Sequence, residues 1–445
     1  YYSMLGYVPA PLCIYENTFK VMPAEIISFG NKITKKNIYY QIPKPELNKE
    51  FSYEKCKKEL LNTFEESIKK MMIADVEIGC FLSGGIDSSL VALLMQKNSK
   101  KKIKTFNVGF NESEYDESKF AKFVAEKIGS HHHDIKVNVD DMLGHIENIA
   151  NIVNEPFSDS SIIPTFIISK LAASKVKVVL SGDGGDEIFM GYNRYSFAKK
   201  IFKLKEKTPN ILRQFIGQGI RLVPSRLYDS LSRPFQKLLG IHGFSHKMSK
   251  LSNILEYENN SDFYEKLNIF DNEVLENKSK YHRNIFDKYQ NFDLIDSVQR
   301  NDIDFYLPND ILVKVDRASM FNSLEVRSPF LSHNVVNKAF ELPIKFKLRN
   351  KTTKYILKDL LSDFLPKSFV YRPKMGFAIP IERWISNKKF RKTLDNIFYE
   401  SCWEEFGWKR EKVLKKWLDY KKFGSSTPQC IWLYLMAGLW LNKWR

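Results

Sequence analysis

Two loops constrain this chain more than any other feature, because each breaks an apolar run with Ser-Gly and then carboxylates. The first is CFLSGGIDSS at 80–89 and the second is VVLSGDGGDEIF at 178–189. We predict a buried strand at Ile78–Leu82 before the first loop, a helix at Ser89–Gln96 after it, and a strand at Val176–Leu180 before the second. In an open parallel sheet both loops lie at the carboxyl ends of strands, where ligands bind, so the pair predicts one nucleotide site.

The surrounding sequence alternates between strand and helix patterns. The further expected elements are a helix at 53–72, a strand at 103–110, a helix at 117–128, a strand near 134–139 and helices at 142–152 and 163–174. This alternation is typical of an α/β fold with a doubly wound parallel sheet. After Tyr195 the strand signal fades, so we expect a largely helical C-terminal region.

Length and composition limit the class of protein. At 445 residues the chain is too long for one ordinary core. It contains no apolar stretch of the roughly 18 to 20 residues that a membrane span needs. The five cysteines have no metal-ligand spacing, which indicates reduced thiols and a cytoplasmic location. Because the first residue is Tyr, without a secretory signal pattern after it, we expect the chain to be part of a longer protein.

The net charge of +17 is concentrated in one segment, because 12 Lys and Arg face two acids between Lys199 and Lys250. Aromatic residues interleave with these charges, as in RNA-binding segments. A solvated helical insert explains the pattern equally simply, since net charge informs about association rather than fold. We favour the insert and expect no nucleic-acid partner. The three histidines at 131–133 favour a loop-to-strand junction over a metal site, because neighbours on a strand point to opposite faces.

The first loop has the chemistry of a pyrophosphate cradle. Its glycines let backbone N–H groups converge, and the following helix N-terminus and the serine hydroxyls add to the anion site. The lysine of a Walker A loop is missing, so the cation must come from elsewhere. Asp87 would repel phosphates unless it holds a metal, and Asp186 is its natural partner ligand for Mg²⁺. A helix N-cap is the alternative role of Asp87.

Four motifs in the same order carry a family resemblance. They are SGGIDSS, GDGGDE followed by GYNRY, LPNDILVKVDRASMFNSLEVRSPFL at 307–331, and RPKMGFAIP at 372–380. Together they resemble the synthetase domain of glutamine-hydrolysing asparagine synthetases over about residues 52–445, whereas SGGxDS alone marks ATP pyrophosphatases in general. The opening, LGYVPAPLCIYENTFKVMPAE, is similar to the tail of that family's N-terminal glutaminase domain. The nucleophilic cysteine that begins such a domain is absent, and Cys13 is not expected to replace it.

The resemblance implies a domain organisation and a reaction. Residues 1–48 correspond to the remnant of the glutaminase domain, 52–195 to an α/β core of the ATP-pyrophosphatase type, 196–300 to the basic helical insert, and 301–445 to a helical part that completes the active site. The implied reaction begins when a substrate carboxylate attacks the α-phosphate of ATP and releases pyrophosphate. Ammonia from the glutaminase domain then displaces AMP. Aspartate, ATP and Mg²⁺ are the implied reactants and cofactors, in a possible homodimer.

Individual roles are also implied by the resemblance. Asp183 takes a proton from ammonia and Lys374 neutralises charge at the α-phosphate, while Asp87 and Asp186 bind the metal. The implied ATP contacts are Phe81, Ser83, Gly84, Gly85, Asp87, Ser88, Ser89, Val108, Ser181 and Gly182.

Two departures from the family concern the substrate. One branch has Glu where this chain has Asp183, which is one methylene shorter. NEPFSDSSIIPTF at 154–166 also lacks the arginine of the aspartate-specific branch. Arg317 and Arg327 are candidates to replace that arginine, with Glu325 as a further substrate contact, and each arginine is equally well explained as a structural ion-pair partner.

The leading hypothesis is an ATP-dependent ligase that makes asparagine. The alternatives are an amidotransferase for another carboxylate, such as a sugar acid, and an RNA-binding tRNA modifier.

Overall fold

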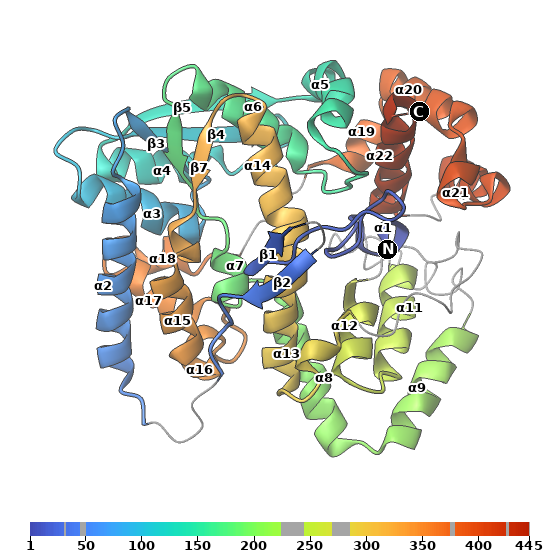
Figure 1. The fold of residues 1–445 in the computed structure, drawn as a ribbon, viewed down its shortest axis with the longest axis horizontal. Coiled ribbons are helices and arrows are strands. Elements are labelled where there is room, and N and C mark those ends of the chain that lie inside the picture. Colours follow the sequence, from blue (N-terminus) through green and yellow to red (C-terminus); the bar gives the residue numbers. More distant parts are fainter. Residues whose placement is uncertain are drawn as a thin grey trace.

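A five-stranded parallel sheet forms the centre of the fold in the computed structural model, which describes residues 1–30, 33–44, 50–223, 244–268, 285–373, 379–423 and 427–444. The strands are β3 (Ile78–Phe81), β4 (Lys104–Phe110), β5 (His131–Val137), β6 (Val178–Leu180) and β7 (Glu325–Arg327). Their order is β5-β4-β3-β6-β7 (Figure 1). The chain order reverses between β3 and β6, and such a switch point opens a crevice at the carboxyl ends of its strands. Both Ser-Gly loops leave the sheet there.

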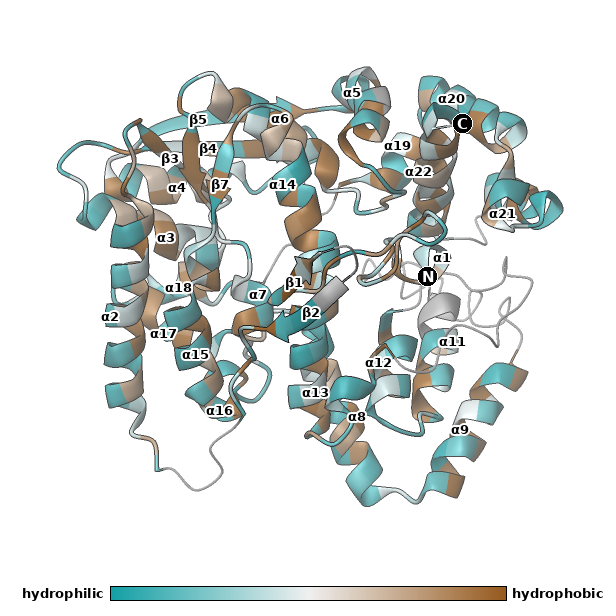
Figure 2. Cartoon of the chain, in the orientation of Figure 1, coloured by the Kyte–Doolittle hydropathy of each residue, from teal (hydrophilic) through white to brown (hydrophobic). Residues whose placement is uncertain are grey.

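Helices cover both faces of the sheet, which confirms the prediction of a doubly wound α/β fold. One core contains the side chains of α2 (Tyr53–Met71), α3 (Ile86–Lys97) and α4 (Ser118–Ile128). The other contains those of α5 (Val139–Ile152) and α6 (Ile162–Ala173). The three inner strands β3, β4 and β6 are mostly buried, as expected when both faces of a parallel sheet are covered. The edge strands β5 and β7 are more exposed and more hydrophilic (Figure 2).

The edge strand β7 was missed by the sequence patterns, so the expectation that strands end at Tyr195 is wrong. β7 has only three residues, too few to show the alternation by which a strand is recognised. It forms by pairing in register with β6, where Val326 lies opposite Val179. A strand of this length depends on its neighbour rather than on its own sequence.

Apart from β7, the described chain after β6 is helical, as predicted for the C-terminal region. Its elements are α7 (Gly185–Ile188), α8 (Asn193–Lys207), α9 (Asn210–Leu222), α11 (Phe244–Leu255), α12 (Asn260–Asn268), η1 (Asp287–Tyr289), α13 (Leu294–Asn301), η2 (Asp302–Ile311), α14 (Leu312–Met320), η3 (Pro329–Leu331), α15 (His333–Glu341), α16 (Ile344–Lys347), α17 (Tyr355–Ser362), α18 (Lys367–Val370), α19 (Ile381–Ile385), α20 (Lys388–Glu400), η4 (Trp403–Phe406), α21 (Arg410–Phe423) and α22 (Pro428–Trp444). In the described ranges, none of these helices has the length and apolarity to cross a membrane. The basic segment is described only as α8, α9 and α11, and its middle lies outside the described residues.

The N-terminal segment begins in the same core as the C-terminal helices and then forms an exposed hairpin. It consists of α1 (Tyr2–Leu5) and the antiparallel strands β1 (Glu25–Phe29) and β2 (Ile33–Ile38). The buried Tyr2 hydroxyl donates a hydrogen bond to the Leu433 carbonyl at 2.8 Å, and the Ala10 N–H donates to Asn309 Oδ1 at 2.8 Å. The chain from residue 1 to about 10 is therefore part of this core, while the predicted domain boundary at residue 48 stays a prediction.

Candidate active site

A cavity of about 590 Å³ lies at the switch point of the sheet. It is lined by residues of both predicted loops and of β4: Phe81, Ser83, Gly85, Asp87, Ser88, Val108, Ser181, Gly182, Asp183 and Asp186. Two predicted contacts are not among the lining residues: Gly84, at the apex of the first loop, and Ser89, which is fully buried. The fold thus brings together segments about 100 residues apart.

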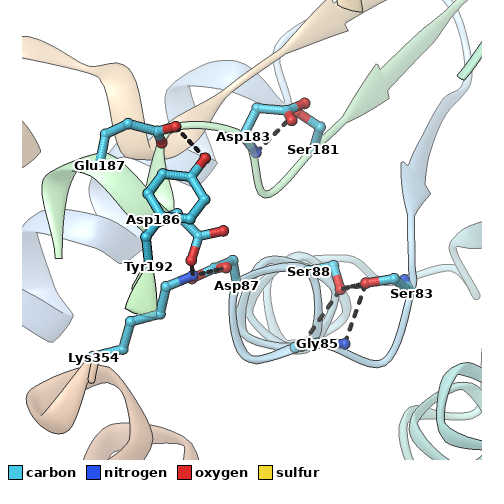
Figure 3. Close-up of polar contacts among 10 residues, drawn as sticks. All are labelled: Ser83, Gly85, Asp87, Ser88, Ser181, Asp183, Asp186, Glu187, Tyr192 and Lys354. Atoms are coloured by element: carbon cyan, nitrogen blue, oxygen red, sulfur yellow. Dashed lines mark hydrogen bonds and ion pairs between the residues drawn. The ribbon is translucent and has the colours of Figure 1, made fainter. Parts of the chain in front are cut away.

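Hydrogen bonds hold the first loop in a tight turn (Figure 3). The Ser83 N–H donates to Ser88 Oγ at 3.2 Å, and the Gly85 N–H donates to Ser83 Oγ at 3.2 Å. Gly84 has a φ of 75°, and a Cβ there would lie 2.5 Å from the carbonyl carbon of Phe120, so only glycine fits. Gly85 is the N-cap of α3, which places Asp87 in the first turn of that helix. The N-cap alternative for Asp87 is therefore wrong.

The second loop lies directly against the first. A Cβ added at Gly182 would be 2.8 Å from the Ser88 nitrogen, so the two backbones touch. This close approach requires glycine for steric reasons alone, because the φ of Gly182 is not in the left-handed region. Carboxylates of the two loops consequently face the same space.

Lys354 supplies the cation that the first loop lacks. Its Nζ forms an ion pair with Asp87 and another with Asp186 Oδ1 at 2.6 Å (Figure 3). The side chain is only 4% exposed. Burial alone would lower the pKa of Lys354, but the two carboxylates outweigh it and raise the pKa above its ordinary value. No local motif marks this residue, which is 267 positions from Asp87 in the sequence.

Asp87 and Asp186 are the residues that would hold a magnesium ion. Asp87 and Asp186 contact one ammonium group, so their oxygens converge on one point. Mg²⁺ in nucleotide sites is commonly bound through one or two carboxylates together with substrate phosphates. Within the described ranges no group of three or more His, Cys, Asp and Glu residues could hold a metal by itself. His132 instead lies on β5 with its Nδ1 2.9 Å from Thr105 Oγ1, in agreement with the strand interpretation of the three histidines.

Two further acids, Asp183 and Glu187, have pKa values raised by desolvation. Burial raises the pKa of Asp183, although the nearby Lys314 opposes this shift. Burial and the neighbouring Asp186 raise the pKa of Glu187 to about 7. The Tyr192 hydroxyl donates a hydrogen bond to Glu187 Oε1 at 2.5 Å (Figure 3). The second loop therefore presents carboxyl groups that accept protons more readily than exposed ones.

The opposite wall contributes a second buried ion pair that the sequence interpretation missed. Lys314 of α14 donates hydrogen bonds to Asp159 Oδ2 at 3.0 Å and to Ser161 Oγ at 2.9 Å. All three residues line the cavity. Lys314 lies within the motif LPNDILVKVDRAS, in which Arg317 is the predicted substrate contact.

Arg372 closes the cavity beside the first loop. Its guanidinium stacks 4.0 Å from the Phe120 ring centre and 4.4 Å from that of Phe369, and it donates to the Gly84 carbonyl at 2.6 Å. Arg372 therefore fixes the position of the loop through a planar contact that lysine cannot reproduce. Lys374, the predicted catalytic lysine two residues further on, lies outside the described residues.

The three proposed substrate contacts of the later motif do not line the cavity. Arg327 donates to the carbonyls of Met71 and Ile73, each at 2.8 Å, and pairs with Glu325 at 2.6 Å. It thus ties β7 to the end of α2. Arg317 is 46% exposed and lies 3.9 Å from Asp316. The geometry favours the structural alternative for both arginines and gives Glu325 no position in the site.

Comparison with known proteins agrees with this geometry. The sequence matches the family model described as asparagine synthase over residues 59–442. It is similar to asparagine synthetase [glutamine-hydrolyzing] 1 of Bacillus subtilis, with 28% identity over 449 residues that cover 99% of this chain and 67% of that protein. A putative asparagine synthetase of Mycobacterium tuberculosis is 32% identical over 333 residues, 74% of this chain and 48% of the relative.

The similarity extends to vertebrates. The asparagine synthetase of Gallus gallus is 22% identical over 414 residues, 88% of this chain and 56% of the relative. The matched regions thus span from about half to two thirds of these relatives. The family model covers most of the chain and includes both loops, Lys314 and Lys354. This chain belongs to the asparagine synthase family.

Proposed function

We propose that this chain is the synthetase part of an ATP-dependent ligase that converts aspartate to asparagine. The observation that carries the proposal is the convergence of Asp87, Asp186 and Lys354 beside a glycine-serine loop in one cavity. This arrangement has the parts needed to bind a pyrophosphate group, namely converging N–H groups, a buried cation and two carboxylates suited to a metal. The family and the names of the relatives support the choice of reaction.

In the proposed first step the side-chain carboxylate of aspartate attacks the α-phosphate of ATP, and pyrophosphate leaves. The loop at Ser83–Ser88 and Lys354 bind the departing phosphates and stabilise the charge that develops on them. Mg²⁺ held by Asp87 and Asp186 would neutralise phosphate oxygens. Lys374 is proposed to stabilise charge at the α-phosphate.

In the proposed second step ammonia attacks the acyl-adenylate and AMP leaves. The attacking nitrogen must lose a proton, and Asp183 is the proposed acceptor because it lines the cavity and its pKa is raised by burial. Its side chain is one methylene shorter than the Glu of the other branch. Asp183 therefore has to accept the proton either from a closer approach of ammonia or through one water molecule.

The source of ammonia follows from the names of the relatives, which are glutamine-hydrolysing enzymes. We propose that residues 1–48 belong to a glutaminase part of the complete protein. A cytoplasmic location and a homodimer remain predictions.

The test is to incubate the chain with ATP, Mg²⁺, ammonium and aspartate, and to measure pyrophosphate, AMP and asparagine. All three products should form in equal amounts and only when aspartate is present. Release that requires a uronic acid in place of aspartate would identify the sugar-acid alternative. A salt-sensitive tRNA complex without release of pyrophosphate from aspartate would favour the RNA-modifying alternative.

A further inference from the structure

We propose that Lys314 and Asp159 recognise the α-carboxylate and the α-ammonium group of the aspartate substrate. The aspartate-specific branch has an arginine in the segment that corresponds to residues 154–166, and this chain lacks it. Lys314 and Asp159 would bind the substrate in place of that arginine. This inference rests on the proposed function, since it identifies how that function selects its substrate.

The pair is built into the wall of the cavity. Asp159 precedes α6, Lys314 lies on α14, and these two helices pack side by side (Figure 1). The side chain of Lys314 is 9% exposed and that of Asp159 is 18% exposed, and both line the cavity. Ser161 fixes the pair, because its N–H and hydroxyl donate to Asp159 Oδ1 at 2.9 and 2.7 Å. Such a supported pair is a preformed site rather than a mobile surface contact.

Among the cations that line the cavity in the described part of the chain, Lys314 is the one that remains available to bind the substrate. Lys354 lies between Asp87 and Asp186, and Arg372 lies 3.8 Å from Glu117. The fourth cation of the described lining residues, Lys358, lies one helical turn after Lys354, so these three cations belong to the phosphate side of the site. Lys314 instead faces the carboxylates of Asp159, Asp183 and Asp310, which together raise its pKa although burial opposes this. The cavity thus has a cationic group near the proposed proton acceptor and away from the phosphate loop.

The chemistry of the pair matches an amino acid better than a simple acid. A lysine and an aspartate side by side present one positive and one negative charge, and the α-carbon of aspartate carries one group of each opposite sign. A sugar acid has no ammonium group for Asp159, so its binding would bury that carboxylate beside neutral hydroxyls or another anion. Burying an unpaired charge is costly, and the pair therefore selects against such acids.

The experiment measures the binding of three acids by isothermal titration calorimetry in the presence of α,β-methylene-ATP and Mg²⁺. Aspartate has both groups, β-alanine lacks the α-carboxylate, and succinate lacks the α-ammonium group. Lys314→Met should weaken aspartate binding by roughly 30-fold or more, the usual effect of removing one partner of a buried charge pair. It should change β-alanine binding by less than about threefold, because the deleted group has no partner there. Asp159→Asn should reduce the preference for aspartate over succinate.

Arg317→Met is the matched control, since Arg317 is a cation of the same helix that does not line the cavity. It should leave aspartate binding within about twofold of the wild-type value. Binding of the nucleotide analogue and thermal unfolding show whether each variant is folded. If Lys314→Met does not fold, Lys314→Gln combined with Asp159→Asn removes both charges together and should give the same loss of aspartate binding.

Unchanged aspartate binding in the folded Lys314 variants would overturn the inference, and so would an equal loss for aspartate and β-alanine. Pyrophosphate release by the wild-type chain separates this result from the proposed function. Binding of aspartate that depends on Lys314 without any release would contradict the reaction and leave the binding site standing. Release with binding that is independent of Lys314 would contradict only the inference.

Discussion

Replacing Lys354 by methionine should strongly destabilise the protein, because this cation pairs with a carboxylate from each of the two Ser-Gly loops. The substitution keeps a long side chain but leaves Asp87 and Asp186 facing each other in a site where the lysine was only 4% exposed. At an effective dielectric constant near 20, a charge pair at the 2.6 Å between Lys354 and Asp186 is worth about 6 kcal/mol before desolvation. Desolvation offsets part of this, and removing one partner of a buried pair costs about 3 to 5 kcal/mol.

Urea unfolding followed by tryptophan fluorescence gives the free energy of unfolding of wild-type and variant protein. The control is Lys351→Met, because Lys351 lies three residues earlier in the same turn region and is exposed. The control should differ from wild type by less than about 0.5 kcal/mol. Mg²⁺ should recover more stability in Lys354→Met than in the wild type, since a cation that binds only the folded state stabilises it by an amount that grows with its affinity.

A different result would refute the reasoning from charge. If Lys354→Met were as stable as Lys351→Met in the absence of Mg²⁺, the two carboxylates would not depend on the ammonium group for their burial. An equal effect of Mg²⁺ on all three proteins would show that the ion does not occupy the position between Asp87 and Asp186.

Four further substitutions test the neighbouring residues. The pKa of Glu187 is raised from 4.5 to about 7, so between these pH values the folded state keeps a proton that the unfolded state loses. The free energy of unfolding of the wild type should therefore fall as the pH rises from about 4.5 to 7. The fall should be up to about 3 kcal/mol larger in the wild type than in Glu187→Gln. Equal pH slopes in the two proteins would contradict the shifted pKa. Arg372→Lys should weaken ATP binding about tenfold, because lysine cannot both stack on Phe120 and donate to the Gly84 carbonyl; unchanged affinity in a nucleotide titration would show that the loop does not need this contact. Asp87→Ala or Asp186→Ala should lower pyrophosphate release by at least about 100-fold, and near-normal release from either variant would exclude the metal assignment.

The sequence predicted the parts of the site whose residues are close together in the chain. The strand before each Ser-Gly loop, the glycines and the carboxylates occur within ten residues of one another, so local periodicity and turn chemistry were sufficient to place them. The elements from α2 to β6 agree with the predicted ones within a few residues for the same reason. Asp87 and Asp186 could be paired because carboxyl ends of parallel strands share one edge of a sheet.

The cations could not be placed in this way. Lys354 comes from a turn 267 residues after Asp87, and no spacing rule relates the two. Arg317 was predicted as a substitute for the arginine that residues 154–166 lack, but Lys314, three residues earlier on the same helix, is buried beside Asp159, whereas Arg317 is exposed. Which of two neighbouring cations faces a cavity depends on helix orientation, which tertiary packing determines.

The burial of the first ten residues limits how this protein can be divided or recombined. Recognition by the family model starts at residue 59, yet Tyr2, Met4 and Leu5 pack in one hydrophobic core with side chains of α22. In a chimera that exchanged only residues 59–442 between two relatives, this core would contain side chains from two different proteins. Side chains that do not fit one another in a core usually lower the stability. The opening segment and the C-terminal helix α22 therefore have to be exchanged together in any chimera, although most of the chain separates them in the sequence.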